Sequence, residues 1–248
     1  MFQSHETLKV VNSIQPKFLW FLVLSYTMAM VLANWFDVRL IQIFSLDTDA
    51  GTLIFPLTFL MSDLITEIYG YQHARQAIWC GFLFNVIFIL YGQLIISLPS
   101  PEYAVINNGK FDEMLSMNFR IIIASMSSYL CSEPLNSLVM AKLKIQYKGQ
   151  MLAVRFIIST LIASGIDSII FGVIAFAGIM DSKNLITLIA TMWLLKIIIE
   201  LIGLPISLYL THKLKKLERI DIYDQKTNFS LFCLQISYTE KDNQYKGN

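Results

Sequence analysis

The sequence is poor in charged residues. Only 15% of its 248 residues are Asp, Glu, Lys or Arg, whereas 55% are hydrophobic. A soluble domain carries about a quarter charged residues, so this chain has too few polar side chains to coat a globule. An ordinary soluble enzyme, a nucleic-acid-binding domain and a disordered chain are excluded as first interpretations. The formal net charge of +1 favours neither an acidic nor a basic partner.

Cysteines are few, and the common catalytic motifs are missing. Cys80, Cys131 and Cys233 are odd in number and widely spaced, so they predict neither a disulfide framework nor a zinc site. The sequence contains no HExxH, GxSxG or Walker A motif, which removes support for metalloprotease, serine hydrolase and ATPase chemistry. We therefore predict a protein that is not an enzyme and that uses no metal and no cofactor.

Long apolar segments dominate the chain instead. A helix needs roughly 20 apolar residues to cross the hydrocarbon core of a bilayer. Sustained alternation of the kind found in membrane β-barrels is absent from the sequence. We predict an all-α polytopic membrane protein whose six transmembrane helices form one bundle in a lipid bilayer. The six segments are Phe18–Phe36, Thr52–Tyr69, Ala74–Leu98, Phe119–Ala141, Leu152–Ile179 and Leu185–Leu210.

The basic residues between these segments predict the orientation. Thirteen Lys and Arg residues fall on the side that holds both termini, and four fall on the other side. Because basic loops stay in the cytoplasm, both termini should be cytoplasmic. The predicted division is an N-terminal cytoplasmic arm over residues 1–17, a transporter domain over 18–211 and a polar cytoplasmic tail over 212–248. We expect the tail to be poorly ordered, as chain ends commonly are.

Seven ionisable side chains remain inside the predicted spans. Each costs about 2.5–3.5 kcal/mol at a helix centre, so they should share a polar interior. At a rise of 1.5 Å per residue, most of them fall in a middle band of the bilayer, with two nearer the cytoplasmic face. The seven are Asp63, Glu67, Glu133, Arg155, Asp167, Lys196 and Glu200.

Their spacing suggests contacts within helices. Asp63 and Glu67 are four residues apart on one helix face, so one of them should hold a proton or meet a cation. Lys196 and Glu200 have the same spacing and could form a structural ion pair. Arg155 could instead extend to lipid phosphates, and Glu67 could be interfacial.

Acids outnumber bases by five to two in this interior, which suits a cationic ligand or one rich in hydrogen-bond donors. A polar site at mid-membrane depth is typical of small-molecule transporters. Glu67 and Arg155 are predicted as coupling or gating residues. The predicted substrate-binding residues are Asp63, Asn85, Glu133, Asn136, Asp167, Lys196 and Glu200.

Several motifs resemble one transporter family. In the second predicted span, Gly51–Leu60 is followed by Ser62-Asp63 and then by Glu67–Gly70. Further matching positions are Arg155, Ser159-Thr160, Ile166-Asp167, Phe171, Ala175-Phe176, Tyr223-Asp224 and Asn228-Phe229. Together they resemble the queuosine precursor transporters of the vitamin uptake type, over most of the chain up to about Phe229.

This resemblance implies an importer of 7-deazaguanines, preQ0 and preQ1, in the bacterial inner membrane, serving the salvage of queuosine for tRNA. A carboxylate could hold the N1–H and 2-amino edge of such a base, and Asp63, Glu133 and Asp167 are the leading candidates. Asn85, Lys196 or Arg155 could donate to O6, and Glu67 and Glu200 could couple protons or bind the ammonium group of preQ1.

Three alternatives remain open at this point. The chain could be the substrate-binding subunit of an ATP-driven importer, docking on its partner through Ala29 and Ala33. It could carry another small nucleobase or vitamin, alone or as a homo-oligomer. It could also be an intramembrane enzyme that uses Asp63 and Asp167 as a carboxylate dyad, which requires the two carboxyls to share a proton.

Overall fold

The structure is a computed structural model, and it describes residues 15–37, 39–43, 46–116 and 119–246. Most of the predicted N-terminal arm therefore lies outside the described residues. The helices are α1 (Leu19–Phe36), α2 (Pro56–Tyr69), α3 (Tyr71–Ile96), α4 (Val105–Ser116), α5 (Phe119–Gln146), α6 (Leu152–Phe176) and α7 (Ser182–Glu218). Three short 3₁₀ helices are η1 (Gly51–Leu53), η2 (Glu102–Ala104) and η3 (Glu240–Asp242).

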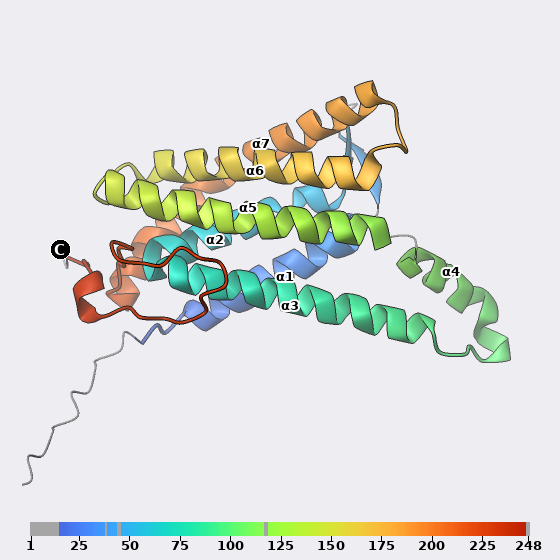
Figure 1. Cartoon of the computed structure of the whole chain (residues 1–248), viewed down its shortest axis with the longest axis horizontal. Helices are drawn as coiled ribbons and strands as arrows, with labels where there is room; N and C mark the ends of the chain where they lie inside the picture. The colour runs from blue at the N-terminus through green and yellow to red at the C-terminus, as the bar shows by residue number, and fades with distance from the viewer. Residues whose placement is uncertain (1–14, 38, 44–45, 117–118, 247–248) are drawn as a thin grey trace, which may run out of the picture.

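Six long helices form one bundle, in which α2 is central (Figure 1). It contacts each of the other five long helices, and α5 packs along the whole of α6. Pro56 stands at the first turn of α2, where its missing N–H costs nothing. Gly70 then joins α2 to α3 with φ +84°, and a Cβ atom here would lie 2.3 Å from the hydroxyl of Tyr238. Only glycine allows this close turn.

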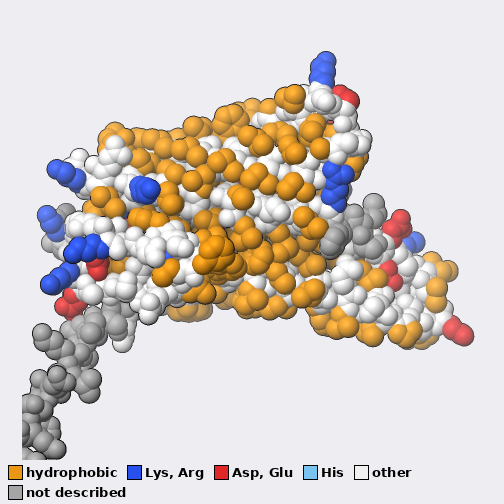
Figure 2. All heavy atoms as spheres, in the orientation of Figure 1, with side chains coloured by type: hydrophobic (Ala, Val, Ile, Leu, Met, Phe, Trp, Pro, Cys, Tyr) orange, Lys and Arg blue, Asp and Glu red, His pale blue; other side chains and the backbone are white. Residues whose placement is uncertain are grey.

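The all-α membrane character is confirmed. Five helices are long and apolar enough to cross a membrane: α1, η1 with α2, α3, α6 and α7. Helix α5 is as long as these but less apolar, because Glu133, Asn136 and several serines lie on its buried face. The count of six spans therefore stays a prediction. Figure 2 shows a broad band of hydrophobic side chains across this face of the bundle, with Lys and Arg side chains at both ends of the view and more of them at the left.

Both described chain ends lie at the same end of the bundle, where the backbone N–H of Lys17 donates to the Glu218 carboxylate at 2.9 and 3.0 Å. We call this the tail end, because residues 219–246 cover it (Figure 1). The opposite hairpin end carries α4 and an antiparallel hairpin formed by β1 (Leu40–Ile43) and β2 (Leu46–Asp49). A shared end implies an even number of crossings. That the tail end faces the cytoplasm remains a prediction.

The C-terminal tail is packed rather than poorly ordered. The buried Arg75 of α3 donates to the carbonyls of Asn228, Ser230 and Gln235 at 2.8, 2.7 and 3.2 Å. The indole of Trp79 donates to the carbonyl of Leu231 at 2.9 Å. The expectation of disorder was wrong because polar composition does not reveal that the tail's backbone groups have partners on α3.

Asp224 fixes the tail to the start of α3. Its carboxylate accepts from the backbone N–H of Tyr71 at 3.1 and 3.3 Å and from the hydroxyl of Tyr238. Burial, together with the nearby Asp224 carboxylate, raises the pKa of Tyr238, so this hydroxyl stays a donor. Acidic groups at a helix N-terminus are also favoured by the helix dipole.

The bounds of several segments differ from the prediction. Helix α7 runs on to Glu218, so the tail starts near Arg219 rather than at residue 212. Helix α5 likewise extends to Gln146, which places Lys144 in a helix instead of a loop. The hairpin and α4 were not predicted, because their short polar sequences carry no strong periodicity.

Removing the Arg75 guanidinium should release the tail. We expect Arg75→Gln to leave at least two tail carbonyls without a donor. Because hydrogen bonds to charged groups contribute about 1.5–3 kcal/mol each, the tail should then bind α3 much more weakly. Limited proteolysis of the purified protein should then cut within residues 219–246 many times faster. Gln76→Ala is the control, because Gln76 makes one exposed bond to the tail, to the carbonyl of Leu234. Equal cleavage of both variants would contradict the docking role.

Candidate functional site

Four helices turn a polar face towards the centre of the bundle. The hydroxyl, amide and ionised side chains on these faces are buried: Thr58, Ser62, Asp63, Thr66 and Glu67 on α2; Ser128, Ser132, Glu133, Asn136 and Ser137 on α5; Arg155, Ser159, Thr160, Ser164 and Asp167 on α6; and Thr191, Lys196 and Glu200 on α7. Polar groups in an apolar bundle persist only where they find partners or serve a function.

Glu67 is the centre of an ion network near the tail end. The Arg155 guanidinium donates to both oxygens of its carboxylate through its two terminal nitrogens, with Nη2 at 3.0 Å from Oε1. Lys215 of α7 contacts the same carboxylate at 2.6 Å, and Lys144 of α5 lies 3.8 Å away. The expectation that Asp63 or Glu67 meets a cation is confirmed at Glu67. The lipid-facing alternative for Arg155 is wrong, since its side chain is buried and bonded to Glu67. Glu67 is buried as well, and its depth in a membrane stays a prediction.

Asp221 of the tail completes this network. Its carboxylate accepts from Lys144 at 2.6 Å and contacts Lys215 at 2.8 Å. Lys144 also donates to the backbone carbonyls of Glu67 and Ile222, at 2.5 and 2.7 Å. The network thus joins four helices and the tail, and it holds three cations against two carboxylates.

A second polar group lies one turn deeper. Asp63 accepts from the Asn136 amide at 2.7 Å and from the Ser159 hydroxyl at 3.5 Å. Glu133 accepts from the Thr58 hydroxyl at 2.6 Å. These contacts bring together α2, α5 and α6, with Glu200 of α7 close enough to act electrostatically on Asp63.

This group has unused hydrogen-bonding capacity. Within the described residues, both carboxylate oxygens of Glu200 and one oxygen of Glu133 are buried without a hydrogen-bond partner. The carbonyl oxygen of Asn136 and the hydroxyls of Ser164 and Ser168 also have none, and the Thr160 hydroxyl lies close to the Glu200 carboxylate. Buried polar atoms are nearly always satisfied in folded proteins, so this concentration is suited to a ligand or to protons.

Lys196 pairs with Asp167 rather than with Glu200. The Lys196 ammonium donates to Asp167 at 2.5 Å, and the Ser132 hydroxyl donates to the other Asp167 oxygen at 3.1 Å. The predicted pair on one helix was wrong because α6 offers a carboxylate across the interface, which spacing along α7 cannot reveal. Towards the hairpin end, Asp37 and Asp49 adjoin this pair around a gap of about 10 Å³.

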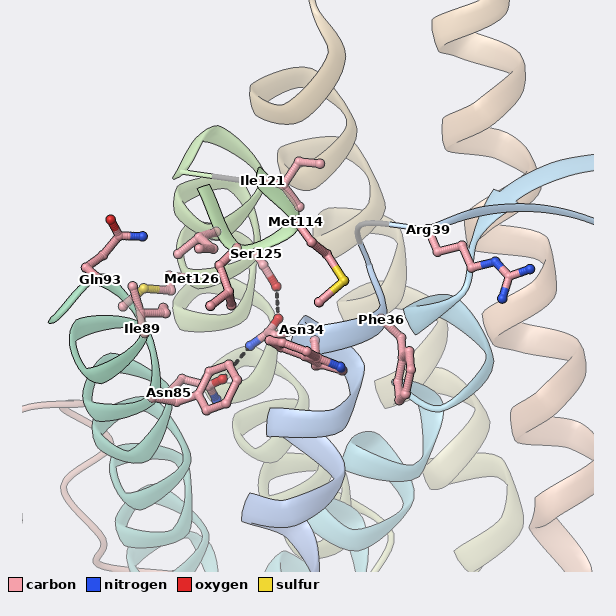
Figure 3. A pocket seen from close by; sticks show the side chains of 15 residues that line it. Asn34, Phe36, Arg39, Asn85, Ile89, Gln93, Met114, Ile121, Ser125 and Met126 are labelled. Atoms are coloured by element: carbon pink, nitrogen blue, oxygen red, sulfur yellow. Dashed lines mark hydrogen bonds between the residues drawn. The ribbon is translucent and has the colours of Figure 1, made fainter. Parts of the chain in front are cut away.

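Asn85 lies apart from the other predicted substrate-binding residues. It accepts a hydrogen bond from the Asn34 amide at 2.8 Å, and Asn34 in turn accepts from Ser125. Figure 3 shows these three side chains on one wall of a cavity between α1, α3 and α5, with Met114 nearby. The cavity measures about 420 Å³ and is otherwise mostly apolar. The remaining six predicted residues converge on α2, α5, α6 and α7.

Sequence reasoning missed three members of the Glu67 network. Lys144, Lys215 and Asp221 stand at helix ends or in the tail, where charged residues are ordinary, so hydropathy gives them no prominence. The one available signal was the local excess of basic residues around the α5–α6 and α7 ends.

Comparison with known proteins identifies a family. Residues 49–210 match the model of a family described as "Putative vitamin uptake transporter". The chain belongs to this vitamin uptake transporter family. A Bacillus subtilis protein named "Probable queuosine precursor transporter" is 27% identical over 180 residues, which is 71% of this chain and 77% of the relative. A Haemophilus influenzae protein of the same name is 31% identical over 101 residues, 41% of each chain. No solved structure matches.

Family membership settles the broad class. The protein is a multi-pass membrane transporter and not an enzyme. The carboxylate-dyad alternative also has no geometric support, because Asp63 and Asp167 bond to different partners on different helices.

Neutralising Glu67 should destabilise the protein. Glu67→Gln leaves the buried Arg155 and Lys144 and the partly buried Lys215 with Asp221 as the one carboxylate of the network, and breaking a buried ion pair costs about 3–5 kcal/mol. We expect a clearly lower thermal midpoint for the purified protein in detergent, followed by scanning fluorimetry. Adding Lys215→Gln to this variant should recover part of the loss, because it restores the charge balance. Glu102→Gln, at an exposed site, is the control. A Glu67→Gln midpoint equal to that of the control would refute the network's role.

Proposed function

We propose that the protein imports a 7-deazaguanine queuosine precursor, preQ0 or preQ1, across the bacterial inner membrane by alternating access. Three observations support this substrate class: the family, the name that both relatives carry, and the resemblance of the Ser62-Asp63 and Glu67–Gly70 motifs. The tail end would face the cytoplasm, in keeping with its basic residues.

The observation that carries the proposal is the set of unpaired carboxylate oxygens on Glu200 and Glu133. A deazaguanine presents N1–H and a 2-amino group as two parallel donors, which a single carboxylate accepts bidentately. Glu200 has both oxygens open, which makes it the best candidate for this edge. Asp63 and Glu133 are then suited to the aminomethyl ammonium of preQ1 or to a coupled proton.

Lys196 is the best candidate donor to O6 of the base. Its ammonium already bridges to Asp167, and it lies 4.8 Å from the centre of the Phe55 ring. Arg155 is less suited to that role, because Glu67 and backbone carbonyls occupy its nitrogens. Asn136 would add an amide oxygen at the same level.

The arrangement corresponds to a closed state in this proposal. The 10 Å³ gap beside Lys196 is about the size of one water probe, far smaller than a deazaguanine. Opening at the tail end would require α5 and α6 to part from α2 and α7, which breaks the contacts of Glu67 with Arg155 and Lys144. Glu67 and Arg155 would therefore act as gate residues, as their position suggests.

Asn85 takes a different role in this account. The 420 Å³ cavity is within the size range of small-ligand pockets, and its amide wall offers donors and acceptors to a planar base. We propose Asn34 and Asn85 as an approach to the site from the hairpin end rather than as part of the central site. Ser125 lines both this cavity and the small gap near Lys196, so its side chain lies between the two.

The ATP-driven alternative has less support. Ala29 and Ala33, its predicted docking face, are 6% and 0% exposed, so the chain itself covers them. Gly51 packs there, since a Cβ atom on it would lie 2.5 Å from the Ala33 carbonyl oxygen. A stand-alone carrier accounts for the charged interior without a partner.

Uptake of labelled preQ1 into proteoliposomes tests the proposal. We expect Glu200→Gln to weaken transport roughly tenfold to a hundredfold, because a hydrogen bond to a charged group contributes about 1.5–3 kcal/mol. Asp63→Asn, Glu133→Gln and Asp167→Asn should each abolish uptake while the protein stays folded.

Glu102→Gln is the matched control, because it removes an exposed acid outside the bundle core. Protein amounts and thermal midpoints should be compared for every variant. Normal uptake by all four folded variants would show that the site is misassigned. Absence of uptake by the unaltered protein would refute the substrate class.

A further inference from the structure

A basic pocket opens at the tail end, separate from the central polar group. It lies between the α5–α6 loop, the end of α7 and the tail, and its volume is about 950 Å³. Four lysines line it: Lys148, Lys215, Lys216 and Lys246. Asp221 is its one acidic lining residue in the described part of the chain.

The single acid does not neutralise the lysines. Asp221 already accepts from Lys144 at 2.6 Å and contacts Lys215 at 2.8 Å. The adjoining Glu67 network itself has one cation more than it has carboxylates. Lys148 and Lys216 are exposed at the pocket, so they add positive charge without a carboxylate within ion-pair distance in the described residues. The electrostatic potential here favours an anion.

Neutral donors complete the lining. Tyr223 and Tyr245 contribute aromatic rings with hydroxyl groups. Burial, and after it the Asp221 carboxylate, raises the pKa of Tyr223, which keeps this hydroxyl protonated and able to donate. Lysine ammonium groups and hydroxyls are ordinary ligands of phosphate oxygens.

The pocket lies at the level of a membrane surface. Tyr209 is 63% exposed on α7 and Lys213 stacks on its ring at 5.7 Å, an arrangement typical of an interfacial aromatic residue. Leu217, next to Lys216, is 51% exposed, so α7 presents an exposed apolar side chain beside the pocket. A lipid beside α7 could therefore place its headgroup in the pocket.

We propose that this pocket binds a phosphate group, supplied by an anionic phospholipid headgroup or by a free phosphate-bearing anion. Basic pockets at helix ends on the cytoplasmic side are known to hold anionic headgroups. The inference concerns binding alone and does not depend on the transported substrate.

The test compares two double variants of the full-length protein. Lys148→Gln with Lys216→Gln removes two pocket charges, while Lys226→Gln with Lys241→Gln removes two exposed charges from the tail outside the pocket. Lys215 is left intact because it contacts Glu67. Native mass spectrometry after reconstitution in mixed phosphatidylglycerol and phosphatidylcholine measures lipid retention, and the thermal midpoint with inorganic phosphate measures binding of the free anion.

We expect the unaltered protein and the control variant to retain phosphatidylglycerol in preference to phosphatidylcholine. The pocket variant should bind it about thirtyfold more weakly, the fold-change for two lysines at about 1 kcal/mol each. Stabilisation by inorganic phosphate without lipid preference, lost in the pocket variant alone, would assign the site to a soluble anion. Equal behaviour of both double variants in both assays would overturn the proposal.

Discussion

The carboxylate of Glu67 is the point at which the parts of this bundle are tied together. A buried carboxylate is costly unless cations and hydrogen bonds surround it. Here those cations come from three different helices, Arg155 from α6, Lys144 from α5 and Lys215 from α7. Asp221 then recruits the tail to the same group. The closed tail end depends on this charge being compensated, and Asp221 adds one more contact to those that Arg75 and Asp224 make between the tail and α3.

Because three cations of the bundle gather around Glu67, the deeper carboxylates of Glu133 and Glu200 are short of hydrogen-bond donors. All three network cations contact Glu67, and Lys196 is bound to Asp167. Glu200 and one oxygen of Glu133 therefore face the bundle centre without a donor in the described structure. In our proposal the interior therefore divides into an acid that holds the fold together and acids that bind the ligand. A transporter of a donor-rich base needs both kinds, one to close the path and one to recognise the cargo.

The sequence predicted the helices well, because long apolar runs directly reflect the bilayer, and the ends of α1 and α6 agree within three residues. It also identified Glu67 and Arg155 as special, because a charge among apolar residues is conspicuous. The spacing favoured a Lys196–Glu200 contact, because residues four apart on one helix are neighbours. Spacing along one helix does not reveal contacts between helices, and the partner of Lys196 is Asp167 on α6. Lys144, Asp221 and the docked tail escaped prediction, because polar residues near helix ends look alike until the chain has folded.

One measurement tests the central claim most directly. The chain would be expressed alone in a bacterium that cannot make queuosine precursors and lacks its own importer, with preQ0 or preQ1 supplied at nanomolar concentration. Our account predicts that queuosine then appears in the tRNA, and that it does so without any added ATPase partner. Absence of queuosine, with the protein verified in the membrane, would contradict the account.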